Sequence, residues 1–441
     1  MNLSATLTVS DATAHDWDAV VIGAGPAGAF LSRQLAQAGR AVLLVEAKAF
    51  PRDKVCGGCL GQHALSVLSA AGLNSLLAQL PVTPIREYEF RWRGRELHLR
   101  RDGGVSISRA ALDTALVRVA IEAGAAFLPE TTARIVPIPE TPRPQPATPA
   151  HRETRLEQSG SPLGTVRSRV VIAADGLTRK SLRDLDDFPT TIAPDAWIGV
   201  QGYLPDLENQ VPPGRVIMAA GRDGYAGLVR VEPDELEPDA HDAESSHRTG
   251  TLSSSRPSPR VNLAAALAPH LLGQGGGPGA AVQTILKTAG IDPPAGIESV
   301  RWRGTGPLTH RSRTLARDRV ILVGDVAGYV EPFTGEGMGH AFASAQALAD
   351  LLLSHESLWS RDLPAQWASL HRQTVTHRQW VIRGLRGALH DPWLVSVLFE
   401  MASRFPALVG FVANRVHQPC SQVVSNQSIP RQSFPSGVAA S

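Results

Sequence analysis

The sequence predicts an α/β protein in which a Rossmann-like domain is split by an inserted antiparallel sheet and followed by a helical C-terminal region. Three observations predict this arrangement. A strand, a glycine turn, a helix and a strand follow one another over residues 19–46, a second strand followed by a turn lies at 319–328, and short alternating strands lie between them. We therefore expect a split domain at 17–185 with 305–355, a sheet domain at 186–304 and helices over 356–441.

The spacing of apolar residues predicts the first strand, helix and second strand. Ala19–Ile22 is an unbroken apolar run, which is typical of a parallel strand buried on both faces. Phe30, Leu31 and Leu35 follow at helical spacing, and Ala41–Val45 is the next apolar run. The split domain is therefore expected to begin with a βαβ unit.

Two further elements are predicted before residue 130. The segment 86–99 turns at Arg93-Gly94 and predicts a two-stranded hairpin. Residues 108–124 predict a helix that begins after an N-cap at Ser108 and ends at Gly124.

The middle of the chain changes character at about residue 190. Short alternating apolar segments from there to 305 predict an antiparallel sheet. The acidic, Ser-rich stretch 232–258 is expected to be a disordered loop within it. The Pro-rich part of 134–170 is expected to form the tip of a long hairpin.

The first glycine turn predicts a dinucleotide site. It reads Gly23-Ala24-Gly25-Pro26-Ala27-Gly28 between a strand and a helix, so its backbone can approach a pyrophosphate at the helix N-terminus. Glu46 ends the next strand, where a carboxylate accepts hydrogen bonds from ribose hydroxyls. We expect Glu46, Ala47 and Lys48 to contact the cofactor. This unit alone does not distinguish FAD from NAD.

Two later motifs favour FAD. Asp325 in Gly324-Asp325 follows a buried strand, where it can accept hydrogen bonds from ribityl hydroxyls. The stretch from Pro332 through Gly335, Glu336, Gly337 and Met338 begins a long helix, whose positive N-terminus would face the flavin ring and favour its reduced form. The predicted cofactor is therefore FAD.

Together these motifs resemble the FAD-dependent hydroxylase superfamily typified by p-hydroxybenzoate hydroxylase. The segments PRDKVCGG at 51–58 and PFTGEG at 332–337 are similar to those of its geranylgeranyl reductase branch. The resemblance spans roughly residues 17–350 and implies an FAD-binding domain of the glutathione reductase type, hydroxylase subgroup. The segment 224–229 replaces the branch's YxWxFP motif, and the WxWxIP motif of flavin-dependent halogenases is not found.

The resemblance also implies roles for individual residues. Arg109 matches an arginine near the FAD diphosphate and ribityl chain, and Asp175-Gly176 matches a motif that touches FAD and is linked with NAD(P)H binding. Cys56-Gly57-Gly58 matches the loop beside the flavin. Because no second Rossmann unit is predicted, NAD(P)H is expected to dock only transiently as electron donor.

The three cysteines are Cys56, Cys59 and Cys420, an odd number that argues against a disulfide framework. Cys56-Gly57-Gly58-Cys59 has the CxxC spacing of a redox disulfide or half of a metal site. No second CxxC exists and the 14 His residues are scattered, so no metal is expected. We interpret the loop as part of the flavin pocket, with Cys56 as the candidate catalytic residue.

Composition and charge exclude several functions. The net charge of +2 gives no basic field for nucleic acid. The polar N-terminus does not resemble a signal peptide, and no apolar run approaches the ~20 residues that cross a bilayer. We expect a cytoplasmic protein, and the sequence gives no indication of its oligomeric state. The C-terminal stretch 377–416 mixes Arg with apolar residues, which suits either a helical cap or a patch that contacts a membrane surface.

Three functions remain open at this point. The first is reduction of a carbon–carbon double bond in a small apolar substrate, prenyl-like or polyketide-like. The second is a flavin monooxygenase that hydroxylates or epoxidises an aromatic or polyketide substrate. The third, also implied by the resemblance, is a lipid-binding escort protein without redox chemistry, and the intact Glu46, Arg109 and Asp325 argue against it.

Overall fold

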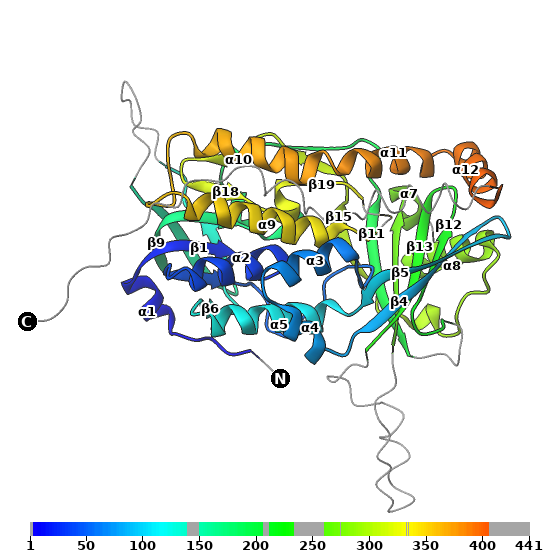
Figure 1. Cartoon of the computed structure of the whole chain (residues 1–441), viewed down its shortest axis with the longest axis horizontal. Coiled ribbons are helices and arrows are strands. Elements are labelled where there is room, and N and C mark those ends of the chain that lie inside the picture. The colour runs from blue at the N-terminus through cyan, green and yellow to red at the C-terminus, as the bar shows by residue number, and fades with distance from the viewer. Residues whose placement is uncertain are drawn as a thin grey trace, which may run out of the picture.

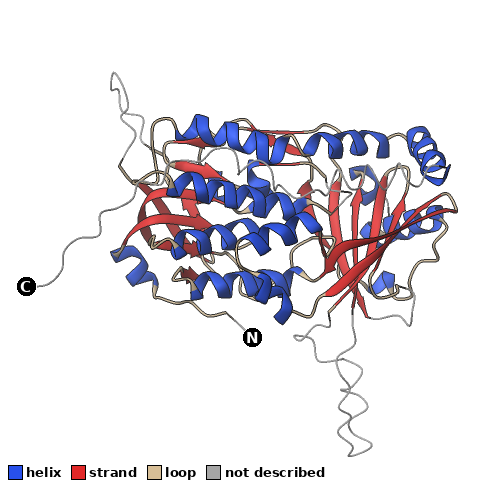
Figure 2. Cartoon of the chain, in the orientation of Figure 1, coloured by secondary structure: helices blue, strands red, loops and turns tan. Residues whose placement is uncertain are grey.

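The computed structural model describes residues 3–138, 150–205, 211–232, 260–273, 275–331, 333 and 335–404. Two large sheets lie side by side, with helices packed in front of the first and a row of C-terminal helices along one edge of both (Figures 1 and 2). The tip of the hairpin predicted at 134–170, nearly all of the loop predicted at 232–258, Pro332 and the end of the chain with Cys420 lie outside the described residues.

The first sheet has a parallel core that joins distant parts of the chain. Its strand order is β17-β18-β9-β1-β2-β6, in which only the β17–β18 pair is antiparallel. The predicted apolar runs form its centre, where Val20 and Val21 are fully buried. Because β18 pairs with β9, a strand from late in the chain completes this sheet. The strands are β1 (Asp16–Ile22), β2 (Val42–Val45), β6 (Ala126–Leu128), β9 (Ser161–Ala173), β17 (Ala316–Arg317) and β18 (Val320–Leu322).

Helices cover one face of the first sheet. Helix α2 packs against both α5 and α9, and Phe30 meets Phe342 edge to face with 5.5 Å between ring centroids. The predicted cap is present, because Ser108 Oγ accepts a hydrogen bond from Ala111 N. The helices near this layer are α2 (Pro26–Gln37), α3 (Gln62–Ala70), α4 (Asn74–Gln79), α5 (Arg109–Glu122) and α9 (Gly337–Leu353).

Smaller elements complete the first domain. The predicted hairpin at 134–170 is present as the antiparallel pair β7 and β8, which continues into β9. Helix α1 packs against β9, and a three-stranded sheet of order β10-β16-β19 lies toward the second sheet. These elements are α1 (Val9–Ala14), β7 (Thr132–Ile135), β8 (Arg152–Gln158), β10 (Thr190–Ile192), β16 (His310–Ser312) and β19 (Gly328–Tyr329).

The second sheet is larger than the predicted insertion and is not wholly antiparallel. Its order is β15-β11-β14-β13-β12-β4-β5-β3, and β12 pairs with β4 in parallel. From the sequence we expected the hairpin at 86–99 to belong to the split domain. The parallel pairing of β4 with β12 instead makes the hairpin part of the second sheet. The strands are β3 (Cys59–Leu60), β4 (Thr83–Trp92), β5 (Arg95–Ser106), β11 (Ile198–Pro205), β12 (Arg215–Ala220), β13 (Gly224–Val231), β14 (Arg260–Leu267) and β15 (Arg303–Pro307).

The remaining helices lie around the second sheet. Helices α7 (Pro269–Gly273) and α8 (Gly277–Ala289) pack near β12 and β13. The expected C-terminal helices are α10 (Leu363–His371), α11 (Gln379–Leu389) and α12 (Pro392–Arg404), and α12 reaches the far end of the second sheet (Figure 1). Within the described residues, none of the helices combines the length and apolar character needed to span a membrane.

Candidate active site

A large cavity of about 1390 Å³ lies between the two sheets. Its wall includes the carboxyl ends of parallel strands in the first sheet, represented by Ile22, Val45 and Ala174. The opposite wall comes from the second sheet and from α11 and α12. Ligands of open α/β sheets bind beyond the carboxyl ends of the strands, so the fold places this cavity where a nucleotide cofactor would lie.

The glycine turn brings α2 against the end of β1. Gly23 has a φ of +103°, and a Cβ there would lie 2.6 Å from the carbonyl oxygen of Ala174. A Cβ on Gly28 would lie 1.9 Å from the Gly23 carbonyl oxygen. Both positions therefore require glycine, and the resulting close packing aims the α2 N-terminus at the cavity.

Glu46 is held in place at the end of β2. Its Oε2 accepts a hydrogen bond from Ala24 N at 3.0 Å and pairs with Arg52 Nη2 at 3.0 Å. Its Oε1 accepts from Lys48 N at 3.1 Å. The carboxylate is 9% exposed and lines the cavity, so it is oriented to accept further hydrogen bonds from hydroxyl groups of a ligand.

Two guanidinium groups flank the N-terminus of α2. A Cβ on Gly25 would lie 3.4 Å from Arg109 Nη2 and 3.9 Å from Arg52 Nη2. Asp113 is fully buried and accepts from Arg109 Nε and Nη2 at 2.9 and 2.7 Å, and from Arg52 Nη1 at 3.1 Å. Burial opposes the charged form of Arg109, but Asp113 outweighs it and keeps the arginine pKa above its ordinary value. The arrangement is an anion site suited to a diphosphate.

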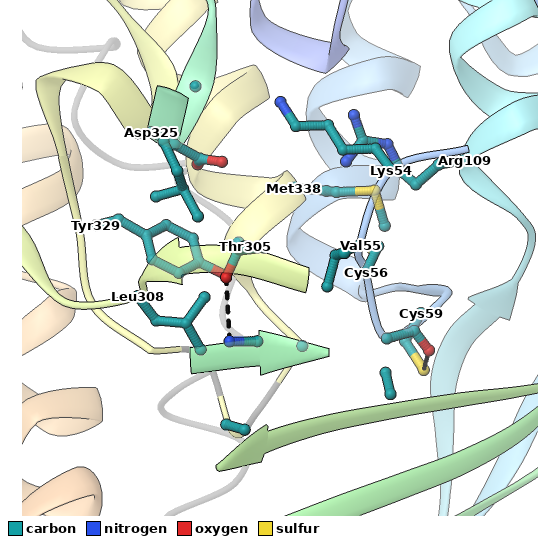
Figure 3. Close-up of a pocket in the computed structure, with 18 of the residues that line it drawn as sticks. Lys54, Val55, Cys56, Cys59, Arg109, Thr305, Leu308, Asp325, Tyr329 and Met338 are labelled. Atoms are coloured by element: carbon teal, nitrogen blue, oxygen red, sulfur yellow. Dashed lines mark hydrogen bonds between the residues drawn. The ribbon is translucent and has the colours of Figure 1, made fainter. Parts of the chain in front are cut away.

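Lys54 adds a third cation to this part of the cavity. Its side chain lies beside Arg109, and the Asp325 carboxylate faces them from the other side (Figure 3). Burial lowers the pKa of Lys54, and Arg109 lowers it further, while Asp325 raises it. A Cβ on Gly176 would lie 2.6 Å from Lys54 Nζ, so the ammonium group sits at the turn after β9.

Sequence reasoning missed Arg52, Lys54 and Asp113. The sequence contains a partial indication of Arg52 and Lys54. The stretch PRDK places these charged residues within a Gly-rich segment that joins two buried elements. The partnership with Asp113 could not be read from the sequence, since it depends on how the loop lies across α5.

Asp175 follows β9 and is half-buried, and one of its two carboxylate oxygens lacks a hydrogen bond. Its Oδ2 accepts from Ser181 N at 2.9 Å, while its Oδ1 has no hydrogen-bond partner among the described residues. Burial raises the pKa of Asp175. Both Asp175 and Gly176 line the cavity.

The cysteine loop forms another part of the wall. Cys56 and Gly57 line the cavity, and Cys56 lies close to Val55 and Met338 (Figure 3). The Cys56 carbonyl accepts from Asn262 Nδ2 at 3.0 Å, which ties the loop to β14. Cys56 and Cys59 are both free thiols. Burial, with a smaller contribution from Cys56, raises the pKa of Cys59 to about 12, so Cys59 stays protonated at neutral pH.

We expect Cys56→Ala to retain FAD and to change turnover by more than about threefold. The main-chain bond from Asn262 survives the substitution, so the loop should keep its shape. Visible absorbance of the purified protein measures FAD occupancy, and steady-state kinetics measures turnover. Full occupancy with unchanged turnover would remove the catalytic role assigned to Cys56.

Helix α9 begins at the cavity, as its sequence predicts. Gly335, Gly337 and Met338 line the wall. Glu336 is 2% exposed and points away from the cavity, because a Cβ on Gly61 would lie 2.8 Å from its Oε1. Glu336 therefore packs beneath the start of α3 instead of facing a cofactor.

The predicted cofactor residues divide into two groups. Most line the cavity: Gly23, Gly25, Pro26, Ala27, Glu46, Ala47, Lys48, Cys56, Gly57, Arg109, Asp175, Gly176, Asp325, Gly335, Gly337 and Met338. Others lie behind its wall: Ala24, Gly28, Gly58, Gly324 and Glu336. Ala24 and Gly28 act through the backbone contacts described above. The His, Cys, Asp and Glu side chains of the described residues form no cluster that could hold a metal ion.

The rest of the cavity is an apolar arm with an aromatic wall. Tyr225 packs edge to face on Phe333 at 5.0 Å and lies 6.0 Å from Trp197. Phe333 also lies 5.9 Å from Phe90. These rings come from separate elements, so the missing YxWxFP motif does not leave the cavity without aromatic residues. Other lining residues are Met218, Ala264, Ala265, Ala266, Leu308, Ile382, Leu389, Val395, Leu398, Phe399 and Met401.

Residues 16–235 match the family model described as FAD binding domain. The chain is 27% identical to menaquinone reductase of Mycobacterium tuberculosis strain H37Rv, covering 90% of each chain. It is 25% identical to digeranylgeranylglycerophospholipid reductase of Methanoculleus marisnigri, covering 88% of this chain and 91% of that one. Kynurenine 3-monooxygenase of Salinispora arenicola is 25% identical over 76% of this chain and 72% of its own.

A solved structure of a flavin-dependent brominase shares the fold. It superposes with a TM-score of 0.64 at 16% identity and covers 91% of this chain and 94% of its own. The structural likeness therefore extends over most of the chain.

Proposed function

Because the chain belongs to the FAD-dependent oxidoreductases that share this FAD binding domain, we propose that it reduces a carbon–carbon double bond in the prenyl chain of an apolar lipid or quinone. One observation carries the proposal. The cavity continues from the cysteine loop and the start of α9 into an apolar arm that reaches α12. A long hydrocarbon chain fits such a space better than a small polar aromatic ring does.

The residues around the other end of the cavity fit FAD. Arg52 and Arg109 would bind its diphosphate, Glu46 its adenosine ribose, and Asp325 its ribityl chain. The unpaired Oδ1 of Asp175 offers a further acceptor. Bound and reduced FAD supplies hydride, while the apolar walls orient the substrate and exclude water. NAD(P)H is proposed as the transient electron donor.

Helix α12 is proposed to contact a membrane surface. Leu398 and Met401 line the cavity and are also 43% and 45% exposed, so they mark its mouth. Trp393 is 69% exposed and Leu394 37% on the same helix. Trp is favoured at the boundary between water and lipid, and exposed apolar residues that continue into an apolar cavity suit entry of a substrate from a bilayer.

We expect the full chain to float with phosphatidylcholine–phosphatidylglycerol vesicles in a density gradient. Replacing Trp393 and Leu394 together by Ser should reduce the bound fraction at least about tenfold, because two apolar side chains no longer enter the lipid. Ile192→Ser is the matched control, since Ile192 is 50% exposed but lies on β10. Wild-type protein that stays at the bottom of the gradient contradicts the membrane contact.

Oxygenation is the second candidate function, favoured by the similarity to kynurenine 3-monooxygenase. The two reactions differ in their need for oxygen. We expect an enzyme reduced with NADH or NADPH under nitrogen to recover its oxidised flavin spectrum when a polyprenyl lipid without a quinone ring is added, because only its double bonds can accept the hydride. Recovery only after admission of oxygen would contradict double-bond reduction and support oxygenation.

A further inference from the structure

Glu331 is a buried carboxyl group that the cofactor site leaves unused. It follows β19 and is 1% exposed, and neither carboxylate oxygen makes a hydrogen bond of ordinary geometry within the described residues, although the Tyr225 hydroxyl lies close enough to act on it. Its main-chain N–H donates to Thr309 Oγ1 at 3.4 Å. A buried charge without a hydrogen bond is costly, so the environment of this side chain favours its neutral, protonated form.

Tyr225 links Glu331 to the cavity. Its ring lines the cavity, and Phe333 and Trp197 restrict its position through the ring contacts given above. The Tyr225 hydroxyl and the Glu331 carboxyl are close enough to influence each other's pKa. Glu331 therefore lies beside a tyrosine of the cavity wall.

Polar groups also lead from Glu331 toward solvent. Arg386 and Asp195 both act on the Glu331 carboxyl, and Asp195 pairs with Arg386 at 2.7 Å and with His390 at 3.6 Å. The Asp195 side chain is 56% exposed. Tyr329 also interacts electrostatically with Glu331. This set of residues connects the buried carboxyl to the exposed side chain of Asp195.

The pKa values of Glu331 and Tyr225 suit transfer of a proton from the carboxyl group to the phenol oxygen. Burial raises the pKa of Glu331 to about 7, with Arg386 and Tyr225 lowering it and Asp195 raising it. Burial, followed by Glu331, keeps the pKa of Tyr225 well above its ordinary value. Near neutral pH the phenol thus keeps its proton, and the carboxyl can both hold and release one.

We propose that Tyr225 donates the proton that completes reduction of the substrate double bond, and that Glu331 then returns a proton to Tyr225. The proposal rests on the proposed function. One alkene carbon gains hydride from the reduced flavin, which is thereby oxidised, and the other gains the Tyr225 hydroxyl proton as the π bond breaks. The phenolate takes the Glu331 proton, and solvent restores it through the polar residues behind.

The Glu331 carboxyl can be tested without FAD or substrate by infrared spectroscopy of the full chain. The carbonyl stretch of its protonated form should disappear as pH rises through about 7, and be missing from E331Q. Because Tyr225 lowers the pKa of Glu331, Y225F should move the midpoint upward. E122Q, which changes an exposed carboxyl, should match wild type. A wild-type spectrum identical to that of E331Q, or an unmoved midpoint in Y225F, overturns the pairing.

Single-turnover kinetics tests the proton transfer itself. Y225F should bind FAD normally and reduce the double bond about a hundredfold more slowly, as expected for loss of a general acid. Y203F alters a tyrosine of the same sheet outside the cavity and should react at the wild-type rate. Over repeated turnovers, in which Tyr225 must regain its proton from Glu331, wild type should slow above pH 7, and E331Q should lose this dependence. Equal rates in Y225F and wild type overturn the assignment, whereas a wild type that reduces no double bond contradicts the proposed function.

Discussion

Gly28→Ala is expected to weaken FAD binding by more than about tenfold and to lower the free energy of unfolding by about 2–3 kcal/mol. The new methyl group would lie 1.9 Å from the Gly23 carbonyl oxygen, and the side chain of Ala174 is 3.1 Å away on the other side. Neither the turn nor the buried sheet can move independently. Helix α2 must therefore shift outward, which displaces the N–H groups of its first turn from the diphosphate position.

Urea denaturation and equilibrium titration with FAD measure the two effects. Gly387→Ala is the matched control, because Gly387 is exposed on α11 and a Cβ there meets no atom within 4 Å. It should leave FAD affinity unchanged and stabilise the protein by no more than about 1 kcal/mol. Wild-type FAD affinity in Gly28→Ala would show that the position of α2 does not determine cofactor binding.

Asp113→Asn is expected to destabilise the FAD-free protein by about 3 kcal/mol, with a smaller loss when FAD is bound. Asp113 is fully buried and is the shared partner of Arg52 and Arg109. Arg52 retains its pair with Glu46, but Arg109 loses its ion pair with Asp113. A diphosphate bound beside Gly25 would supply the missing negative charge, so ligand binding should restore part of the stability.

Urea denaturation with and without saturating FAD checks this result. Asp16→Asn provides a matched control, because Asp16 is 66% exposed and its pairing with Arg167 at 3.8 Å contributes little. Its effect should stay within about 0.5 kcal/mol and should not depend on FAD. An equal loss in Asp113→Asn with and without FAD would mean that the two arginines do not face the cofactor's phosphates.

Local patterns in the sequence predicted much of the first sheet. The apolar run Ala19–Ile22 and the glycine turn specify their own conformations, and Ser108 caps its helix through a contact three residues away. The placement of β4 and β5 could not be predicted in this way. Their alternation predicts a hairpin, but the parallel pairing of β12 with β4 depends on contacts between distant segments that alternation does not encode.

The same limit applies to the site. Residues in contiguous motifs, such as Glu46 and Met338, were predicted because neighbouring residues in the same motif indicate their role. Asp113 was missed because its helix shows no unusual pattern, and its role arises only where α5 meets the loop of Arg52. Tyr225 and Glu331 were missed as a pair for a related reason, since β13 and the segment after β19 become neighbours only in the folded chain.

The mass of the product tests double-bond reduction most directly. The protein, FAD, NADH or NADPH and a polyprenyl lipid without a quinone ring in vesicles are incubated under nitrogen, and in parallel under ¹⁸O-labelled oxygen. We predict a product that has gained two hydrogen atoms per reduced double bond in both atmospheres and carries no label. A product that forms only with oxygen and contains one labelled oxygen atom would contradict this account.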